Sequence, residues 1–134
     1  MKIAISAEST IDLPKELLQK FDIHTVPFTV IMGDNVYLDG EFDNTKLFEY
    51  FDKNKKLPST SAVNEYQYKE HFENLLKDYD AVIHLSLSSG VSSAYRNAQN
   101  VANEMNNVYV IDTLSLSTGI ALLALKAREM VDNN

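Results

Sequence analysis

Hydrophobic residues along the chain form two kinds of segment, and the two kinds alternate. Short, mostly apolar runs, which are typical of strands buried in a parallel sheet, occupy residues 2–7, 81–87 and 108–112. Segments with apolar residues every three or four positions, which predict amphipathic helices, follow them. The clearest such stripe comprises Ala94, Ala98, Val101, Ala102 and Met105. This alternation predicts strands joined by helices.

Local signals add further elements in the first half of the chain. Pro14 suits the first turn of a helix that runs to about residue 20. Residues 24–32 are rich in β-branched residues and predict a strand that is bent, or lies at a sheet edge, because Pro27 interrupts it. Residues 35–38 predict a short returning strand after a turn.

The middle of the chain carries two helix start signals. Asp43 is a plausible N-cap for a helix through residue 51 or so, and residues 58–61 are expected to form a loop. Asn64 and Gln67 have the spacing of a capping box, which predicts a second helix beginning there. Together with the strand–helix alternation, these elements predict an α/β fold: a mainly parallel sheet with helices on both faces, in one domain over residues 1–134.

The last predicted helix, residues 118–131, is apolar on almost every side. A helix of this kind is expected to be buried on more than one side. We therefore expect either another chain to cover it or the polypeptide to be part of a longer protein.

Composition narrows the classes of partner. The 134 residues carry a formal net charge of -7, which disfavours binding to nucleic acid and to anionic membrane surfaces. The absence of cysteine rules out disulfides and thiolate metal sites. No apolar run approaches the length of a membrane span, and the N-terminal run is too short for a signal peptide. The absence of cysteine is compatible with a reducing cytoplasm, and a cytoplasmic location is what we expect.

Hydroxyl side chains gather in three loops that each connect a predicted strand to a predicted helix. They are Ser9 and Thr10; Ser88, Ser89, Ser92 and Ser93; and Thr113, Ser115, Ser117 and Thr118. In a parallel sheet these loops emerge at one edge, and the loop at residues 59–61 could fold over it. Free N–H groups at the helix starts and hydroxyl donors would favour a small anion there. The alternative is that these residues only cap helices.

Signals for catalysis or metal binding are weak. None of His24, His71 and His84 adjoins a serine loop with an orienting partner, so we interpret them as structural, with His71 exposed to solvent. No spacing resembles a metal site, and we expect no catalytic residue, metal or cofactor. Asp12 and Asp112 lie near the loops, where each is either a cap or an acceptor for hydroxyls.

Four short motifs, in order along nearly the whole chain, resemble those of the DegV family. They are Glu8-Ser9-Thr10-Ile11-Asp12-Leu13-Pro14, Pro58-Ser59-Thr60-Ser61, Ser88-Ser89-Gly90-Val91-Ser92-Ser93-Ala94-Tyr95 and Val110-Ile111-Asp112-Thr113. The resemblance implies a protein that binds one long-chain fatty acid between two α/β domains. It also implies that the protein presents the carboxylate to a separate fatty-acid kinase catalytic subunit and has no catalysis of its own.

By motif match, the resemblance assigns the fatty-acid carboxylate to Thr60, Ser61 and Ser92. Possible neighbours of this group are Ser9, Thr10, Ser89 and Gly90. The family is about twice this length, so the chain is expected to be the N-terminal lipid-binding domain, without the C-terminal domain.

Two departures from the family pattern affect the site. Glu8 stands where the family usually has aspartate, and Ser92-Ser93-Ala94 replaces its Ser-Gly-Thr. A different class of function remains as the alternative: a phosphotransfer or kinase-like domain that binds a small phosphorylated metabolite. That alternative needs a reactive histidine or a magnesium-binding acidic cluster at the loops, and the sequence indicates neither.

Overall fold

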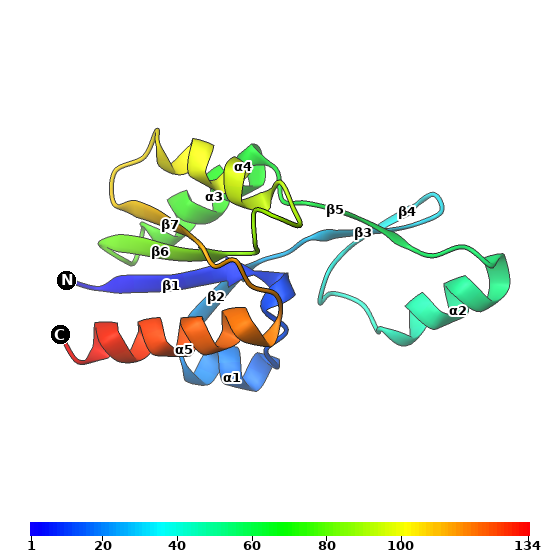
Figure 1. The fold of residues 1–134 in the computed structure, drawn as a ribbon, viewed down its shortest axis with the longest axis horizontal. Coiled ribbons are helices and arrows are strands. Elements are labelled where there is room, and N and C mark those ends of the chain that lie inside the picture. The colour runs from blue at the N-terminus through cyan, green and yellow to red at the C-terminus, as the bar shows by residue number, and fades with distance from the viewer.

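Four parallel strands form the main sheet of the protein (Figure 1). The computed structural model describes all residues from 1 to 134. The strands β1 (Ile3–Glu8), β2 (Ile23–Val26), β6 (Ala81–Ser86) and β7 (Val108–Asp112) lie in the order β2-β1-β6-β7. All three neighbouring pairs are parallel, so the carboxyl ends of the strands share one edge.

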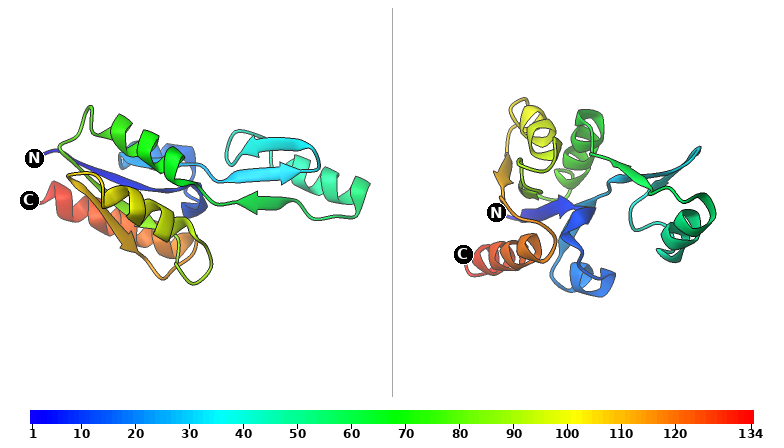
Figure 2. Two further views of the ribbon diagram at one scale, coloured as in Figure 1. Left: turned by 90° about the horizontal axis from the view of Figure 1, so that it is seen from above. Right: turned by 45° about the vertical axis from the view of Figure 1, so that its right-hand side comes forward.

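Helices cover both faces of this sheet, as Figures 1 and 2 show. Helices α3 (Glu65–Leu75) and α4 (Ala94–Ala102) lie on one face, and α1 (Lys15–Lys20) and α5 (Thr118–Asp132) lie on the other. A single 3₁₀ turn, η1 (Ser9–Ile11), follows β1. The predicted α/β class with a mainly parallel sheet is therefore confirmed. None of the helices has the length and hydrophobicity that crossing a bilayer requires.

A second, antiparallel sheet projects from the main body (Figures 1 and 2). It contains β3 (Thr29–Met32), β4 (Asn35–Leu38) and β5 (Ser59–Ser61) in the order β4-β3-β5, and α2 (Thr45–Asn54) lies between β4 and β5 in the chain. We call residues 29–61 the arm.

Two sequence predictions change in the arm. The strand predicted over residues 24–32 divides at Pro27 into β2 and β3, which belong to different sheets. Because proline has no N–H to donate to a ladder, the chain leaves the main sheet there. The loop predicted at residues 58–61 is wrong for residues 59–61, which pair with β3 as strand β5.

The two predicted helix starts are close to the observed ones. Asn64 and Gln67 form a complete capping box at the start of α3, as predicted. Helix α2 begins at Thr45, whose N–H donates to the carboxylate of Asp43 over 2.9 Å. This helix buries none of its residues, and Phe48 is 72% exposed.

The hydrophobic core lies between the main sheet and its helices. Its largest fully buried hydrophobic side chains are Ile5, Ile11, Val63, Tyr68, Phe72, Val82 and Ile120. Helix α5 contributes Ile120, Ala121 and Ala124 to the core but leaves Leu122 and Leu123 exposed. Residues 1–134 thus cover only one side of this apolar helix.

A polar network is buried inside this core, on the face that α3 covers. Its members are Ser6 and Glu8 from β1, His84 and Ser86 from β6, and Tyr68 and His71 from α3. Ser6, Glu8, His84 and Ser86 have no exposed surface. The prediction that His71 is exposed to solvent is wrong: its Nε2 atom lies 2.7 Å from the Ser6 hydroxyl.

The carboxylate of Glu8 is the centre of the network. Its Oε1 atom accepts hydrogen bonds from Tyr68 (2.6 Å), Ser86 (2.8 Å) and His84 (3.0 Å), and its Oε2 atom accepts the Leu87 N–H (3.0 Å). Burial raises the pKa of this carboxyl, but the His84 charge and the hydrogen bonds lower it more, so the pKa falls to about 2. Glu8 is therefore ionised at neutral pH.

The network continues from Glu8 toward the surface through a chain of hydrogen bonds. The Nδ1 atom of His84 lies 2.9 Å from the Ser6 hydroxyl, which in turn contacts His71. Burial is the main reason why the pKa of His71 falls from 6.5 to about 3, and the neighbouring imidazole of His84 lowers it further. His71 is therefore neutral in the folded protein at pH 7.

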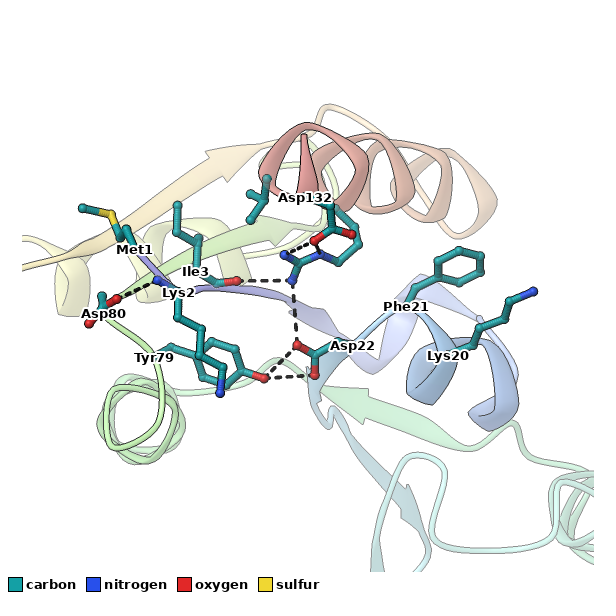
Figure 3. Close-up of a pocket in the computed structure, with 11 residues that line it drawn as sticks. Met1, Lys2, Ile3, Lys20, Phe21, Asp22, Tyr79, Asp80 and Asp132 are labelled. Atoms are coloured by element: carbon teal, nitrogen blue, oxygen red, sulfur yellow. Dashed lines mark hydrogen bonds and ion pairs between the residues drawn. The ribbon is translucent and has the colours of Figure 1, made fainter. Parts of the chain in front are cut away.

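A second polar cluster holds the amino-terminal edge of the sheet together (Figure 3). Arg128 of α5 donates to the carbonyl of Ile3 (3.3 Å), pairs with Asp132 (2.7 Å) and lies 3.8 Å from Asp22. Tyr79 donates to the carboxylate of Asp22 from the other side. These residues line a hollow of about 640 Å³ at the edge opposite to the hydroxyl loops.

Replacing Arg128 by alanine is expected to lower the free energy of unfolding by about 1–3 kcal/mol, because the Arg128 side chain is only 11% exposed and its removal takes a charged donor from the half-buried Ile3 carbonyl. Urea denaturation measures this change. Lys126→Ala is the matched control on the same helix, where an exposed pair with Glu129 contributes less than about 1 kcal/mol. Equal effects of the two substitutions on the free energy of unfolding would show that Arg128 does not hold this edge of the sheet together.

Acid is expected to destabilise the fold in two steps. The unfolded chain binds a proton at His71 between about pH 6.5 and 3 that the folded protein does not bind, so stability falls as the pH falls through this window. Glu8 has a lowered pKa, so its contribution is present above about pH 4.5 and is lost toward pH 2. Each proton adds a slope of at most about 1.4 kcal/mol per pH unit.

The His71→Gln variant separates the two steps, since glutamine keeps a hydrogen-bonding group without titrating. Urea midpoints between pH 7 and 4.5 should depend less steeply on pH in this variant than in the wild type. Identical slopes would show that His71 does not take up the proton on unfolding.

Candidate functional site

Three hydroxyl loops meet at the carboxyl edge of the main sheet, as the sequence predicts. Ser9 and Thr10 follow β1, residues 88–93 follow β6, and residues 113–117 follow β7. The parallel pairing of these strands places the three loops side by side.

Backbone hydrogen bonds join the second and third loops. The N–H of Ser88 donates to the carbonyl of Ser115 over 3.2 Å. Asp112 accepts the N–H groups of Ser89 (3.1 Å) and Leu114 (3.2 Å), one from each loop. The hydrogen bonds from Ser89 hold the pKa of Asp112 below its usual value. Asp112 is therefore an acceptor that ties two loops together.

The serine hydroxyls are oriented by the backbone. The Oγ atom of Ser9 accepts the Phe28 N–H (3.0 Å), and the Oγ atom of Ser92 accepts the Ala94 N–H (3.1 Å). A hydroxyl that accepts in this way still has its own proton to donate. Ser9 and Ser92 can each offer that proton to an anion.

The remaining neighbours differ in their surroundings. Gly90 is exposed and donates its N–H to the Ser88 hydroxyl over 3.1 Å. The Thr10 hydroxyl oxygen is buried and has no hydrogen-bond partner. Asp12 ends the turn η1 in the left-handed conformation, with φ of 56°.

Two helix N-termini point to the same edge. Helix α4 begins at Ala94 and α5 begins at Thr118. The N-cap residues Ser93 and Ser117 make no side-chain hydrogen bond to their helices, and the Ser92 hydroxyl accepts the first N–H of α4. The free N–H groups and the helix dipoles favour negative charge at this edge without a cationic side chain.

Thr60 and Ser61 lie on β5, at the base of the arm, and both are exposed. Successive side chains of a strand point to opposite faces. Thr60 therefore shares a face with its partner Val30, and Ser61 shares the other face with Thr29. Neither side chain forms a hydrogen bond within the chain, so both hydroxyls remain available.

One hydrogen bond attaches the base of the arm to α4, the helix that follows the loop at residues 88–93. The side-chain amide of Asn97 in α4 donates to the carbonyl of Val63 over 2.9 Å. Val63 follows Ser61 by two residues and is fully buried. This bond ties the chain just after β5 to α4, the helix that follows the loop of Ser92.

Exposed apolar side chains border the hydroxyls. Val91 is 61% exposed in the second loop, and Leu114 and Leu116 are 74% and 57% exposed in the third. The carboxyl edge of the sheet thus combines neutral donors with apolar surface.

The sequence interpretation missed the buried network beneath these loops. Ser6 and Glu8, and likewise His84 and Ser86, are polar residues two positions apart in otherwise apolar strands. This spacing places each pair on one face of its strand and is the signal that could have revealed a polar patch in the core. The register pairs Ser6 with His84 directly.

Ser6, His84 and Glu8 are connected in the order hydroxyl, imidazole, carboxylate, as in a serine hydrolase. A catalytic serine must reach its substrate. Ser6 has no exposed surface, and its oxygen is also bonded to His71. We therefore interpret the three residues as structural. No group of three histidine, aspartate or glutamate side chains is arranged to hold a metal ion.

Comparison with known proteins identifies the family of this chain. A family model described as "Uncharacterised protein, DegV family" matches residues 2–134. Protein DegV of Bacillus subtilis is 33% identical over 136 residues, which is 99% of this chain and 48% of that protein. A protein of Thermotoga maritima named "Fatty acid-binding protein" is 33% identical over 138 residues, with the same two coverages. The chain spans about half the length of these relatives.

Solved structures show the same fold. The structure of a fatty-acid-binding DegV family protein from Thermus thermophilus matches with a TM-score of 0.92 and 27% identity, over 100% of this chain and 49% of that one. The structure of DegV from Bacillus subtilis, described as a fatty acid binding protein, matches with a TM-score of 0.91 and 32% identity, over the same shares. From its sequence and its fold alike, this chain belongs to the DegV family.

Proposed function

We propose that this chain binds a long-chain fatty acid and holds its carboxylate with loop hydroxyls at the carboxyl edge of the main sheet. The observation that carries the proposal is the orientation of these hydroxyls. Ser92 accepts a backbone N–H and keeps its proton free, while Thr60 has no partner within the chain. The N-termini of α4 and α5, whose N-cap side chains make no hydrogen bond to the helix, add favourable potential for an anion.

The carboxylate ligands in this proposal are Thr60 and Ser92, with Ser61 beside Thr60. Ser9, Thr10, Ser89 and Gly90 are the surrounding groups. Neutral donors suit a monoanion with an apolar tail, because the apolar residues beside the loops can contact the first part of that tail. The names of the fatty-acid-binding relatives from Thermotoga maritima and Bacillus subtilis support the same ligand.

The proposed role is binding without catalysis. Ser6 is the serine that contacts a histidine, and it is buried. Following the family resemblance, we further propose that residues 1–134 form the N-terminal domain of a two-domain binder. In this proposal the bound carboxylate is presented to a separate fatty-acid kinase subunit.

Thr60→Val and Ser92→Ala are each expected to weaken fatty-acid binding by about 10- to 100-fold, the cost of losing one hydrogen bond to a charged group. Native mass spectrometry and a fluorescent fatty-acid displacement assay on this chain measure the change. Ser61→Ala should have a smaller effect than Thr60→Val, because Ser61 leaves β5 from the opposite face.

Ser59→Ala is the matched control, since Ser59 lies on the same strand and shares the face of Ser61. Unchanged affinity in both Thr60→Val and Ser92→Ala would refute the carboxylate assignment. Thermal stabilisation of the chain by inorganic phosphate but not by fatty acid would instead favour a phosphate-binding domain.

A further inference from the structure

We call residues 88–93, the second of the three hydroxyl loops, the hydroxyl loop. It leaves the main sheet at Leu87, and one hydrogen bond fixes the backbone at this residue. Strand β6 ends at Ser86, and the first serine of the loop is Ser88. The N–H of Leu87 donates to Oε2 of Glu8 over 3.0 Å, and Leu87 is buried. A side chain of β1 therefore anchors the backbone at which the loop begins.

Glu8 is itself held in one position. The three donors Tyr68, His84 and Ser86 all bind Oε1, so this oxygen is saturated and the plane of the carboxylate is set. Oε2 is left with the Leu87 N–H as its one donor. The donors to Oε1 come from α3 and β6. The helix and the strand together therefore orient Oε2 toward the N–H of Leu87, where the loop begins.

The other side of the same point is held by the third loop. Thr113 donates its N–H (3.2 Å) and its hydroxyl (2.7 Å) to the carbonyl of Ser86. The peptide between Ser86 and Leu87 is thus fixed through its carbonyl by Thr113 and through its N–H by Glu8. Ser92 lies five positions after Leu87, so a change in the direction of this peptide displaces the proposed carboxylate ligand.

We propose that Glu8 is a positioning residue for the hydroxyl loop, acting through the N–H of Leu87. Its effect on the loop follows from contacts within the chain alone. Its effect on the ligand rests on the proposed function, in which Ser92 of the same loop holds a carboxylate.

Three variants test the positioning role. Glu8→Ala removes the acceptor of Leu87. Glu8→Gln keeps one oxygen that can still accept this N–H, so it should rescue part of the effect and also serves if the alanine variant fails to fold. Tyr79→Phe is the matched control: it removes a hydrogen bond from a tyrosine to the carboxylate of Asp22, at the opposite edge of the sheet.

Hydrogen exchange of the backbone amides is the first measurement, and it needs no ligand. Glu8→Ala should speed exchange at Leu87 and Ser88 by about 10-fold or more relative to residues 82–85 of β6, as expected for a lost hydrogen bond to a charged group. Glu8→Gln should lie between Glu8→Ala and the wild type, and Tyr79→Phe should leave this ratio unchanged. Equal acceleration in Glu8→Ala and Tyr79→Phe, or wild-type exchange in both glutamate variants, would overturn the proposal.

Fatty-acid affinity is the second measurement. Glu8→Ala should weaken binding by about 10-fold, and it should add little when Ser92 is already alanine, because both changes act on the same contact. Full additivity with Ser92→Ala would contradict an action through the loop. If the wild-type chain binds no fatty acid, the proposed function fails, and the exchange comparison still decides the role of Glu8.

Discussion

A carboxylate without access to water must have its oxygens satisfied by donors, and this requirement organises the centre of the protein. The carboxylate of Glu8 draws one donor from α3, two side-chain donors from β6 and one backbone N–H from the residue that follows β6. Removing any one donor leaves part of a buried charge unsatisfied, so the helix and the two strands are constrained together. The core of this protein is therefore specified partly by polar contacts.

The carboxyl edge above this network follows a different principle. There the donors are neutral hydroxyls and free helix N-termini, and the acidic chain provides no cluster of cations. Such donors suit a single negative charge at the end of an apolar molecule, because they match a carboxylate without drawing highly charged anions. Glu8 contacts this edge only through the N–H of Leu87, and its carboxylate stays buried beneath the loops.

The sequence predicted those parts of the structure whose signals are local. The apolar runs located β1, β6 and β7, and the Asn64–Gln67 spacing located the start of α3. The strand at residues 59–61 was missed because three polar residues carry no periodic signal and form a strand only by pairing with β3. The contact between Ser6 and His84 was missed for a similar reason, since the sheet register brings together residues 78 positions apart.

The candidate site divides in the same way. The three loops and their common edge could be predicted, because the carboxyl ends of parallel strands lie at one edge of a sheet in any strand order. The opposite directions of Thr60 and Ser61 depend on an unpredicted strand. The burial of His71 depends on how α3 is rotated over the sheet, and its charged neighbours in sequence, Glu70 and Glu73, indicated the reverse.

The arm makes the proposed head-group site span two parts of the protein. The chain enters the arm at Pro27–Phe28 and leaves it at Ala62–Val63, and α2 buries none of its residues. A ligand held by Thr60 and Ser92 at once joins the arm to the body of the protein. The ligand then adds a link between these two parts, so affinity depends on how the two short connections hold the arm as well as on the hydrogen bonds to the ligand.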